Sequence, residues 1–403
     1  MRVKQKSITE KGLYISITLL FIYAFWYQYI NINSNLFTIL GVLCLLFCFA
    51  RLKLNINYYK ELTSLIVFMA FCSITLIINN FSFDRHLVRL ISMYKYMIPL
   101  LGIYLYVDGD RRRFKHILIS ICITTVLMFI SIHGSSIVYK TGAITFGRSA
   151  DMNTNVLSSI ICLGLFSALY LLFDNSSKVI RIILIIYICY CLYTQILAAS
   201  RRGFVEFCFL LILSLFSYVQ IKYRNKMIVK ILGVLALLLG AFLVYTYLSI
   251  NSSSIALMQR FATKDSIGDQ NRIFYMHSSI ELFKQSPFIG MGLGSVEKSI
   301  GMYSHSLYLE LLASTGIVGS IFLLCSLFLN ELIFLGKFSL IRNNQNIRNV
   351  ISCRLVFVFI ISILIGGIGV VYLYDLYFYI MIALVLSHRK FADLEKNTNS
   401  SGI

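Results

Sequence analysis

The sequence predicts an all-α, polytopic membrane protein, and three observations support this fold class. Hydrophobic residues make up 58% of the chain and charged residues only 13%, with a mean hydropathy of +0.80. Apolar runs close to the roughly 20 residues that a membrane-crossing helix needs recur along the whole chain. The lysines and arginines gather in alternate connecting segments, which is typical of a chain that crosses the membrane many times. A soluble domain would need none of these features.

We expect about 12 transmembrane helices and one large loop between them. Residues 1–248 would hold the first nine helices, residues 249–304 would form the loop, and residues 305–403 would hold the last three helices and a polar tail. The predicted spans lie near 13–30, 36–50, 62–79, 90–107, 116–132, 155–173, 179–199, 203–221, 227–248, 306–335, 350–374 and 376–387.

The net charge of +19 could suggest a nucleic-acid-binding protein, but the positions of the charges exclude this class. Of the 36 Lys and Arg residues, 23 are assigned to the side of both termini, 11 to the opposite side, and two, Lys95 and Arg354, to spans; Arg181 and Lys230, near the ends of their spans, are counted with the adjoining loops. By the positive-inside rule the richer side is cytoplasmic. Both termini and the C-terminal tail are therefore expected in the cytoplasm, and the loop 249–304 outside it.

The few basic residues on the outer side are candidates for binding an anion. Arg85 and Arg89 lie four residues apart, so on a helix they share a face and repel each other. An anion between them would relieve this repulsion, and a guanidinium suits phosphate better than an ammonium does. The alternative is that each arginine anchors the protein to lipid headgroups. The same two interpretations apply to Arg148, Arg201, Arg202 and Arg272.

His305 lies at the outer mouth of the predicted span 306–335. If a helix begins there, His305 and Gly316 face the same way and Gly319 lies near the same stripe. Glycines at this spacing let a neighbouring helix approach, so His305 would face protein. The positive end of the helix macrodipole disfavours imidazolium, and a neutral imidazole can act as a general base. The alternative is a buried interfacial histidine with a structural hydrogen bond.

The loop itself contains two recognisable segments. Residues 271–285 predict an interfacial helix that stops before Pro287. The glycines at 290, 292 and 294 then predict a tight turn, whose backbone N–H groups could meet an anion. A dinucleotide site is excluded because no βαβ unit surrounds these glycines. The spacing of Cys and His predicts no metal site, and we expect neither a metal nor a cofactor.

These residues together resemble a known family. His305-Ser306, nine further residues and Gly316-x-x-Gly319 resemble the His-(Asn/Ser/Gln)-x9-Gly-x-x-Gly signature of O-antigen ligases, and related patterns occur in O-antigen and capsule polymerases. Asn271-Arg272, the run from Pro287 to Gly292, Ser200-Arg201 and the Asn155 region resemble other motifs of this superfamily in the same order. The motifs cover roughly residues 145–320, and the first four spans match in hydropathy only.

The resemblance implies a glycosyltransferase of the GT-C type in a bacterial inner membrane. It would use undecaprenyl-diphosphate-linked glycans as donor and acceptor, in contact with membrane lipids and without a metal. Arg201 and Arg272 would bind the diphosphate, and His305 would act on the acceptor hydroxyl. A chain-length regulator and a flippase are expected as further partners. Additional substrate-binding residues would be Arg202, Arg148, Arg85, Arg89 and Asn155, and Gly316 and Gly319 would have structural roles.

Three functions remain open from the sequence. We favour a polymerase that joins oligosaccharide repeat units into O-antigen or capsular polysaccharide, partly because Ser320 stands where ligases often have Thr or Gly. The first alternative is the ligase that transfers finished polymer to lipid A–core. The second, of a different class, is a transporter of lipid-linked oligosaccharide. A transporter usually has interrupted helices around a midplane site, whereas this chain has only two prolines, Pro99 and Pro287.

Overall fold

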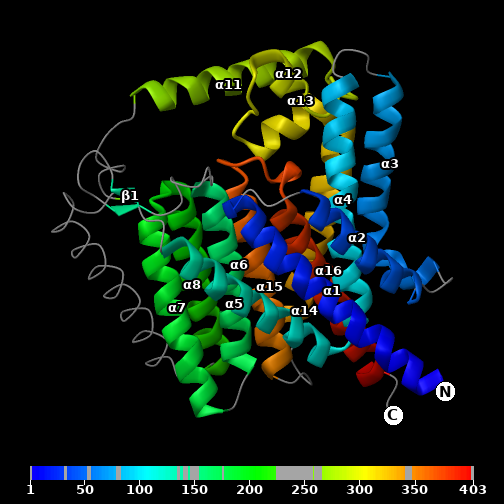
Figure 1. Ribbon diagram of the computed structural model, residues 1–403, viewed down its shortest axis with the longest axis vertical. Coiled ribbons are helices and arrows are strands. Elements are labelled where there is room, and N and C mark those ends of the chain that lie inside the picture. Colours follow the sequence, from blue (N-terminus) through cyan, green and yellow to red (C-terminus); the bar gives the residue numbers. More distant parts are fainter. Residues whose placement is uncertain are drawn as a thin grey trace.

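The computed structural model describes a bundle of helices (Figure 1). The residues that it describes are 2–30, 34–51, 56–78, 83–133, 137–138, 144–145, 154–174, 177–223, 257, 266–340 and 347–400. The first part of the bundle consists of α1 (Arg2–Ile30), α2 (Ser34–Phe49), the 3-10 helix η1 (Ile56–Leu62), α3 (Thr63–Ile78), α4 (Phe83–Val107), α5 (Arg111–His133), α6 (Thr154–Asp174), α7 (Lys178–Ala198) and α8 (Arg201–Lys222).

The second part contains two helices of the loop and the last helices of the bundle. These elements are α11 (Ser266–Gln285), α12 (Ser295–Ile300), α13 (Leu307–Ser320), the π-helical stretch η2 (Ile321–Leu329), α14 (Asn330–Leu340), α15 (Ile347–Gly366), the 3-10 helix η3 (Tyr372–Tyr374) and α16 (Leu376–Ser400). A two-residue antiparallel pair, β1 (Ile137–Val138) with β2 (Ile144–Thr145), is the one strand pairing in the described ranges.

The fold class predicted from the sequence is confirmed. Among the described residues, eight helices are long and apolar enough to cross a membrane, and Ile39–Phe49 forms a shorter apolar helix. The eight candidate spans are Tyr59–Ile78, Phe83–Val107, Arg111–Ile130, Thr154–Asp174, Lys178–Ala198, Arg201–Lys222, Leu307–Gly336 and Ile347–Gly366. The predicted span 227–248 lies outside the described residues. The chain is thus an all-α polytopic membrane protein.

Helices α11 and α12 lie across one end of the bundle, whereas α1 begins and α16 ends at the opposite end (Figure 1). The helix predicted for residues 271–285 is present, begins earlier at Ser266, and ends at Gln285, two residues before Pro287. Helices α11 and α12 of the predicted outer loop are therefore separated from the start of α1 and the end of α16 by the length of the bundle. This arrangement brings the motif-bearing segments of the loop to one end of the molecule.

The predicted stripe of His305, Gly316 and Gly319 on one continuous helix is wrong. His305 lies before α13 and has a positive φ of 60°, and Gly316 interrupts α13 with φ 62° and ψ −166°. This combination is accessible essentially to glycine alone, because a Cβ atom would collide with the backbone. The eleven-residue spacing suits a continuous helix equally well, so periodicity could not reveal the break.

The turn that follows α11 supplies hydrogen-bond partners for the backbone groups at the break in α13. The N–H groups of Met291 and Gly292 donate to the carbonyls of Ala313 and Ser314, at 2.9 and 3.0 Å. On the other side of the break, the N–H of Ile317 donates to the Pro287 carbonyl at 2.9 Å. Backbone groups released by a helix break inside a membrane protein must find such partners, since no water is available in lipid. The turn N–H groups are thus bonded within the protein, and the suggestion that they meet an anion is not supported at these positions.

We expect Gly316→Ala to destabilise the protein by more than about 3 kcal/mol. A Cβ at Gly316 would touch the backbone C and O atoms of Phe288 and would lie 2.7 Å from the Gly290 nitrogen, so the turn would have to leave the helix break. Gly336→Ala is the control, because its added Cβ would approach neighbouring elements no closer than 4.0 Å, at the Phe357 ring. Thermal unfolding of both purified variants measures the difference. Equal stability of the two would show that the insertion of the turn is not required.

The predicted span 350–374 ends early. Helix α15 stops at Gly366, and residues 367–375 continue as turns and the 3-10 helix η3 before α16 begins. The segment 367–375 is tied to the start of α13, because the Leu307 N–H donates to the Gly367 carbonyl at 2.8 Å. A segment of turns and 3-10 helix thus lies directly beside the His305 loop, and the two together form part of the site described next.

Candidate active site

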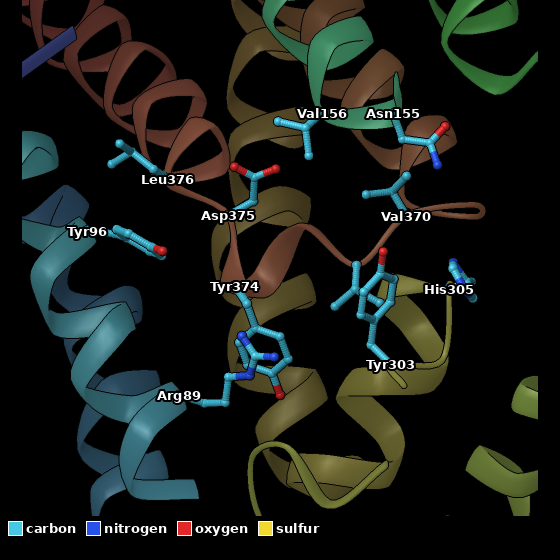
Figure 2. A pocket seen from close by; sticks show the side chains of 11 residues that line it. Arg89, Tyr96, Asn155, Val156, Tyr303, His305, Val370, Tyr374, Asp375 and Leu376 are labelled. Atoms are coloured by element: carbon cyan, nitrogen blue, oxygen red, sulfur yellow. The ribbon is translucent and has the colours of Figure 1, made fainter. Parts of the chain in front are cut away.

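A cavity of about 210 Å³ lies where the segments 301–306 and 367–375 meet α4 and the first turn of α6. The segment 301–306 contributes Tyr303 and His305, and the segment 367–375 contributes Val370, Val371, Tyr374 and Asp375 (Figure 2). The remaining lining residues are Arg89 and Tyr96 of α4, Asn155 and Val156 of α6, and Leu376 of α16. The cavity thus combines one guanidinium, one imidazole and one carboxylate with aromatic and apolar walls.

His305 is held in place by its backbone. The Ser304 N–H donates to Oε2 of the fully buried Glu310 at 3.0 Å, and the Ser304 hydroxyl donates to the Ser306 carbonyl at 2.8 Å. A positive φ at a residue other than glycine costs of order 1–3 kcal/mol and persists only where the surroundings impose it. Glu310 supplies part of that constraint, and it also accepts a hydrogen bond from the Tyr374 hydroxyl at 3.3 Å.

The imidazole of His305 lies between two tyrosine rings. Its ring centroid lies 5.6 Å from that of Tyr275, in a stacked arrangement, and 4.7 Å from that of Tyr303, in a tilted one. Burial lowers the pKa of His305, and the positive charge of Arg272 lowers it further. The neutral form of the imidazole, which the sequence predicts, is therefore favoured. The causes are burial and the charge of Arg272, whereas the prediction from the sequence rests on the helix macrodipole.

Arg272 reaches this site from α11. It lies three residues before Tyr275, so on the helix the two share a face, and its charge acts on His305. Its side chain is exposed and does not line the cavity. The structure thus brings Arg272 and His305 together, as the sequence motifs suggest.

The anion between Arg85 and Arg89 is a carboxylate of the protein itself. Arg89 donates from Nε and Nη2 to Oε2 of Glu297, at 2.9 and 2.6 Å, and Arg85 Nη1 lies 3.4 Å from Oε1 of the same side chain. The Arg89 guanidinium also lies over the Tyr374 ring, 4.7 Å from its centroid. Arg89 therefore faces the cavity, whereas Arg85 lies outside its lining.

The motif Ser200-Arg201 forms a rigid corner between α7 and α8. Ala199 ends α7 in the left-handed conformation, and the Ser200 hydroxyl oxygen accepts from the Gly203 N–H at 3.2 Å, which caps α8. The same hydroxyl donates to the Asn155 side chain at 2.8 Å. Since Asn155 lines the cavity, this bond places the start of α8, and Arg201 with it, next to the site. An arginine in the first turn opposes the helix macrodipole, so the corner is strongly electropositive.

Arg202 faces the inside of the protein. Its Nη2 donates to Glu206 Oε2 at 2.6 Å and to the Tyr372 hydroxyl at 2.9 Å, while a Cβ on Gly369 would lie 3.3 Å from its side chain. The Arg202 side chain, which extends from α8, thus packs against the segment 367–375 and stabilises it. The sequence predicts that Arg202 contacts substrate directly. Such a contact would require Arg202 to break its hydrogen bonds to Glu206 and Tyr372. Arg148, a further predicted binding residue, lies outside the described residues.

Several site residues were missed in the sequence, and most of them are acidic or aromatic. Glu206, Glu310 and Asp375 are buried carboxylates in or beside membrane-crossing helices, where an ionisable residue is a functional candidate by default. The charged site candidates predicted from the sequence are all basic residues, and they therefore do not include these carboxylates. The glycines at 366, 367 and 369 also indicate a helix break inside the predicted span.

No group of three or more His, Cys, Asp or Glu residues within the described ranges is arranged to hold a metal ion. The charged groups at the site are instead the arginines, His305 and the buried carboxylates.

The fold and the site define a polytopic membrane protein with a cavity at one end of its helical bundle, lined by an arginine, a histidine and an aspartate. Residues 182–324 match the family model described as O-antigen ligase, and this match supports the superfamily of O-antigen polymerases and ligases. The matched segment contains Arg201, Arg272, His305 and Gly316. No curated protein sequence matches the chain at a significant level. The match indicates a membrane enzyme of the O-antigen polymerase/ligase type.

Proposed function

We propose that this protein is a glycosyltransferase that polymerises undecaprenyl-diphosphate-linked oligosaccharide repeat units into O-antigen or capsular polysaccharide on the outer face of the bacterial inner membrane. The observation that carries the proposal is one cavity holding a half-buried imidazole of lowered pKa and a guanidinium, with Arg272 beside the imidazole. A flippase would supply the lipid-linked units, and a chain-length regulator would limit the polymer.

The residues at the site suit both parts of glycosyl transfer, which are the deprotonation of the acceptor and the departure of the lipid diphosphate. His305 takes the proton of the acceptor hydroxyl, whose oxygen attacks the anomeric carbon of the donor. The bond between that carbon and the diphosphate oxygen breaks, and its electron pair leaves with the diphosphate. Arg201 and Arg272 stabilise the charge that grows on this leaving group, as preorganised cations do at other developing anions. Cationic side chains thus serve where other glycosyltransferases use a metal ion.

Incubation of purified protein with lipid-linked repeat units tests the proposal. A ladder of multimers on a gel is the expected product of a polymerase. Transfer to lipid A–core, with no ladder, would instead indicate the ligase. Repeat units that stay unchanged in length, in protein that is folded, would contradict both enzymatic functions and favour a transporter.

The proposed orientation predicts opposite locations for two positions of the chain. Asp269 lies in α11 and Ser400 ends α16, and the two helices end at opposite ends of the bundle (Figure 1). Because the positive-inside rule places the termini in the cytoplasm, a periplasm-active reporter should work at Asp269 and a cytoplasm-active one at Ser400. Reporters on the same side of the membrane would contradict the proposed topology.

A further inference from the structure

We propose that Asp375 is the carboxylate that binds the acceptor sugar, accepting a hydrogen bond from one of its hydroxyl groups. This inference rests on the proposed function and assigns a second substrate subsite within the same cavity. No sequence motif of the chain points to Asp375, and only the structure brings it to the site.

The carboxylate of Asp375 has one oxygen available for a ligand. It stands directly before α16, and its Oδ1 accepts from the Tyr377 N–H at 3.1 Å, which caps the helix. The other oxygen makes no hydrogen bond with the residues that the structure describes, although Asp375 is only 9% exposed. Asp375 also lines the cavity, together with Tyr374 and Val156 (Figure 2).

Capping alone does not explain an aspartate at this position. Asn and Ser cap helices about as well as Asp does, without the cost of burying a charge. Burial raises the pKa of Asp375 to about 6, although the Tyr377 N–H and the charge of Arg202 act in the opposite direction. At neutral pH the group is therefore mostly ionised and can only accept hydrogen bonds. A buried acceptor that faces a cavity needs a donor from the ligand, and a sugar hydroxyl is such a donor.

The charges of the cavity separate the two substrates. Arg89 and Tyr374 lie on one side of Asp375 in the view of Figure 2, and His305 with Tyr303 lies on another. A carboxylate repels the diphosphate of the donor, since like charges at short range are strongly unfavourable in a low dielectric. The donor diphosphate is therefore directed to Arg201 and Arg272, and the uncharged sugar of the acceptor is directed to Asp375. His305 then meets a hydroxyl of the sugar that Asp375 holds.

Substitutions that preserve the cap separate ligand binding from helix capping. Asp375→Asn and Asp375→Ser both retain an oxygen for the Tyr377 N–H but lose the charged acceptor in the cavity. A hydrogen bond to a charged group contributes enough that its loss should weaken acceptor binding roughly 10- to 100-fold. Asp110→Asn is the matched control, because Asp110 caps α5 by accepting from the Arg112 N–H at 2.7 Å and does not line the cavity.

The probe is the repeat-unit oligosaccharide released from its lipid diphosphate by mild acid, titrated into the purified full-length protein. We expect Asp375→Asn and Asp375→Ser to weaken its binding 10- to 100-fold, with unchanged binding of the lipid-linked donor, whereas Asp110→Asn matches the wild type. Wild-type affinity for the oligosaccharide in either Asp375 variant, or an equal loss of donor binding, would overturn the inference. Thermal unfolding identifies any variant that is misfolded. If one of the two Asp375 variants misfolds, the oligosaccharide affinity of the other decides whether Asp375 binds the acceptor sugar. A wild-type protein that binds both ligands but transfers no sugar would contradict the proposed function instead.

Discussion

His305→Ala should slow glycosyl transfer roughly 10²- to 10⁴-fold and leave donor binding intact, because a positioned general base typically contributes this much. The imidazole is half-buried, lies between Tyr275 and Tyr303, and has a lowered pKa. His305→Gln keeps a hydrogen-bonding group of similar size but no base, so it should stay slow as well. Turnover and donor binding are measured on the same purified variant.

The pH dependence gives an independent test of the same role. A base works when it is deprotonated, and a pKa below the usual 6.5 places the loss of kcat/KM below that pH. Arg272→Gln removes a positive charge that lowers the pKa of His305, so the acid limb should move to higher pH. Arg272→Lys keeps the charge and should leave the limb in place, although turnover falls.

A structural role for His305 predicts different results. The alanine variant would then lose stability, because its ring packs against two tyrosines, and its folded fraction would remain active. A well-folded His305→Ala protein with near-normal turnover would remove His305 from the mechanism. An acid limb unaffected by Arg272→Gln would assign that limb to another group.

The sequence was sufficient for the fold class, and it also predicts the region of the candidate site. Composition, apolar runs and the distribution of Lys and Arg predict a polytopic helical protein, because these features follow directly from the membrane environment. The helix before Pro287 and the motifs around Arg272 and His305 are also readable, since each depends on residues close together in the chain. The structure places these segments at one end of the bundle (Figure 1).

Features that depend on distant partners could not be read in the same way. Glu297 neutralises Arg89 from 208 residues away, and the turn at Met291 closes a break at Gly316 that the apolar pattern hides. The segment ending in Asp375 looks like the continuation of a membrane span, because most of its residues are apolar. Asp375 is the residue in the sequence that indicates otherwise, since a carboxylate within an apolar run requires a partner or a ligand.

Arg201→Ala and Arg272→Ala should each lower turnover roughly 10²- to 10³-fold, or about 2–4 kcal/mol of transition-state stabilisation, with near-normal amounts of folded protein. Arg201 begins α8 at the corner that Ser200 and Asn155 hold beside the cavity, and Arg272 acts on His305 from α11. Substitution by Lys should restore activity only in part, because an ammonium cannot make the two parallel hydrogen bonds of a guanidinium.

Lys284→Ala provides the control for a role in lipid anchoring. Lys284 lies on α11 like Arg272, with a 63% exposed side chain that pairs with Glu281 at 2.7 Å. An exposed pair of this kind contributes little, so this variant should keep nearly full turnover. If Arg272→Ala behaves like Lys284→Ala, Arg272 is a headgroup anchor. If both arginines hold one diphosphate, the double alanine variant should lose less than the product of the two single losses, because removal of either contact already weakens the shared leaving-group site.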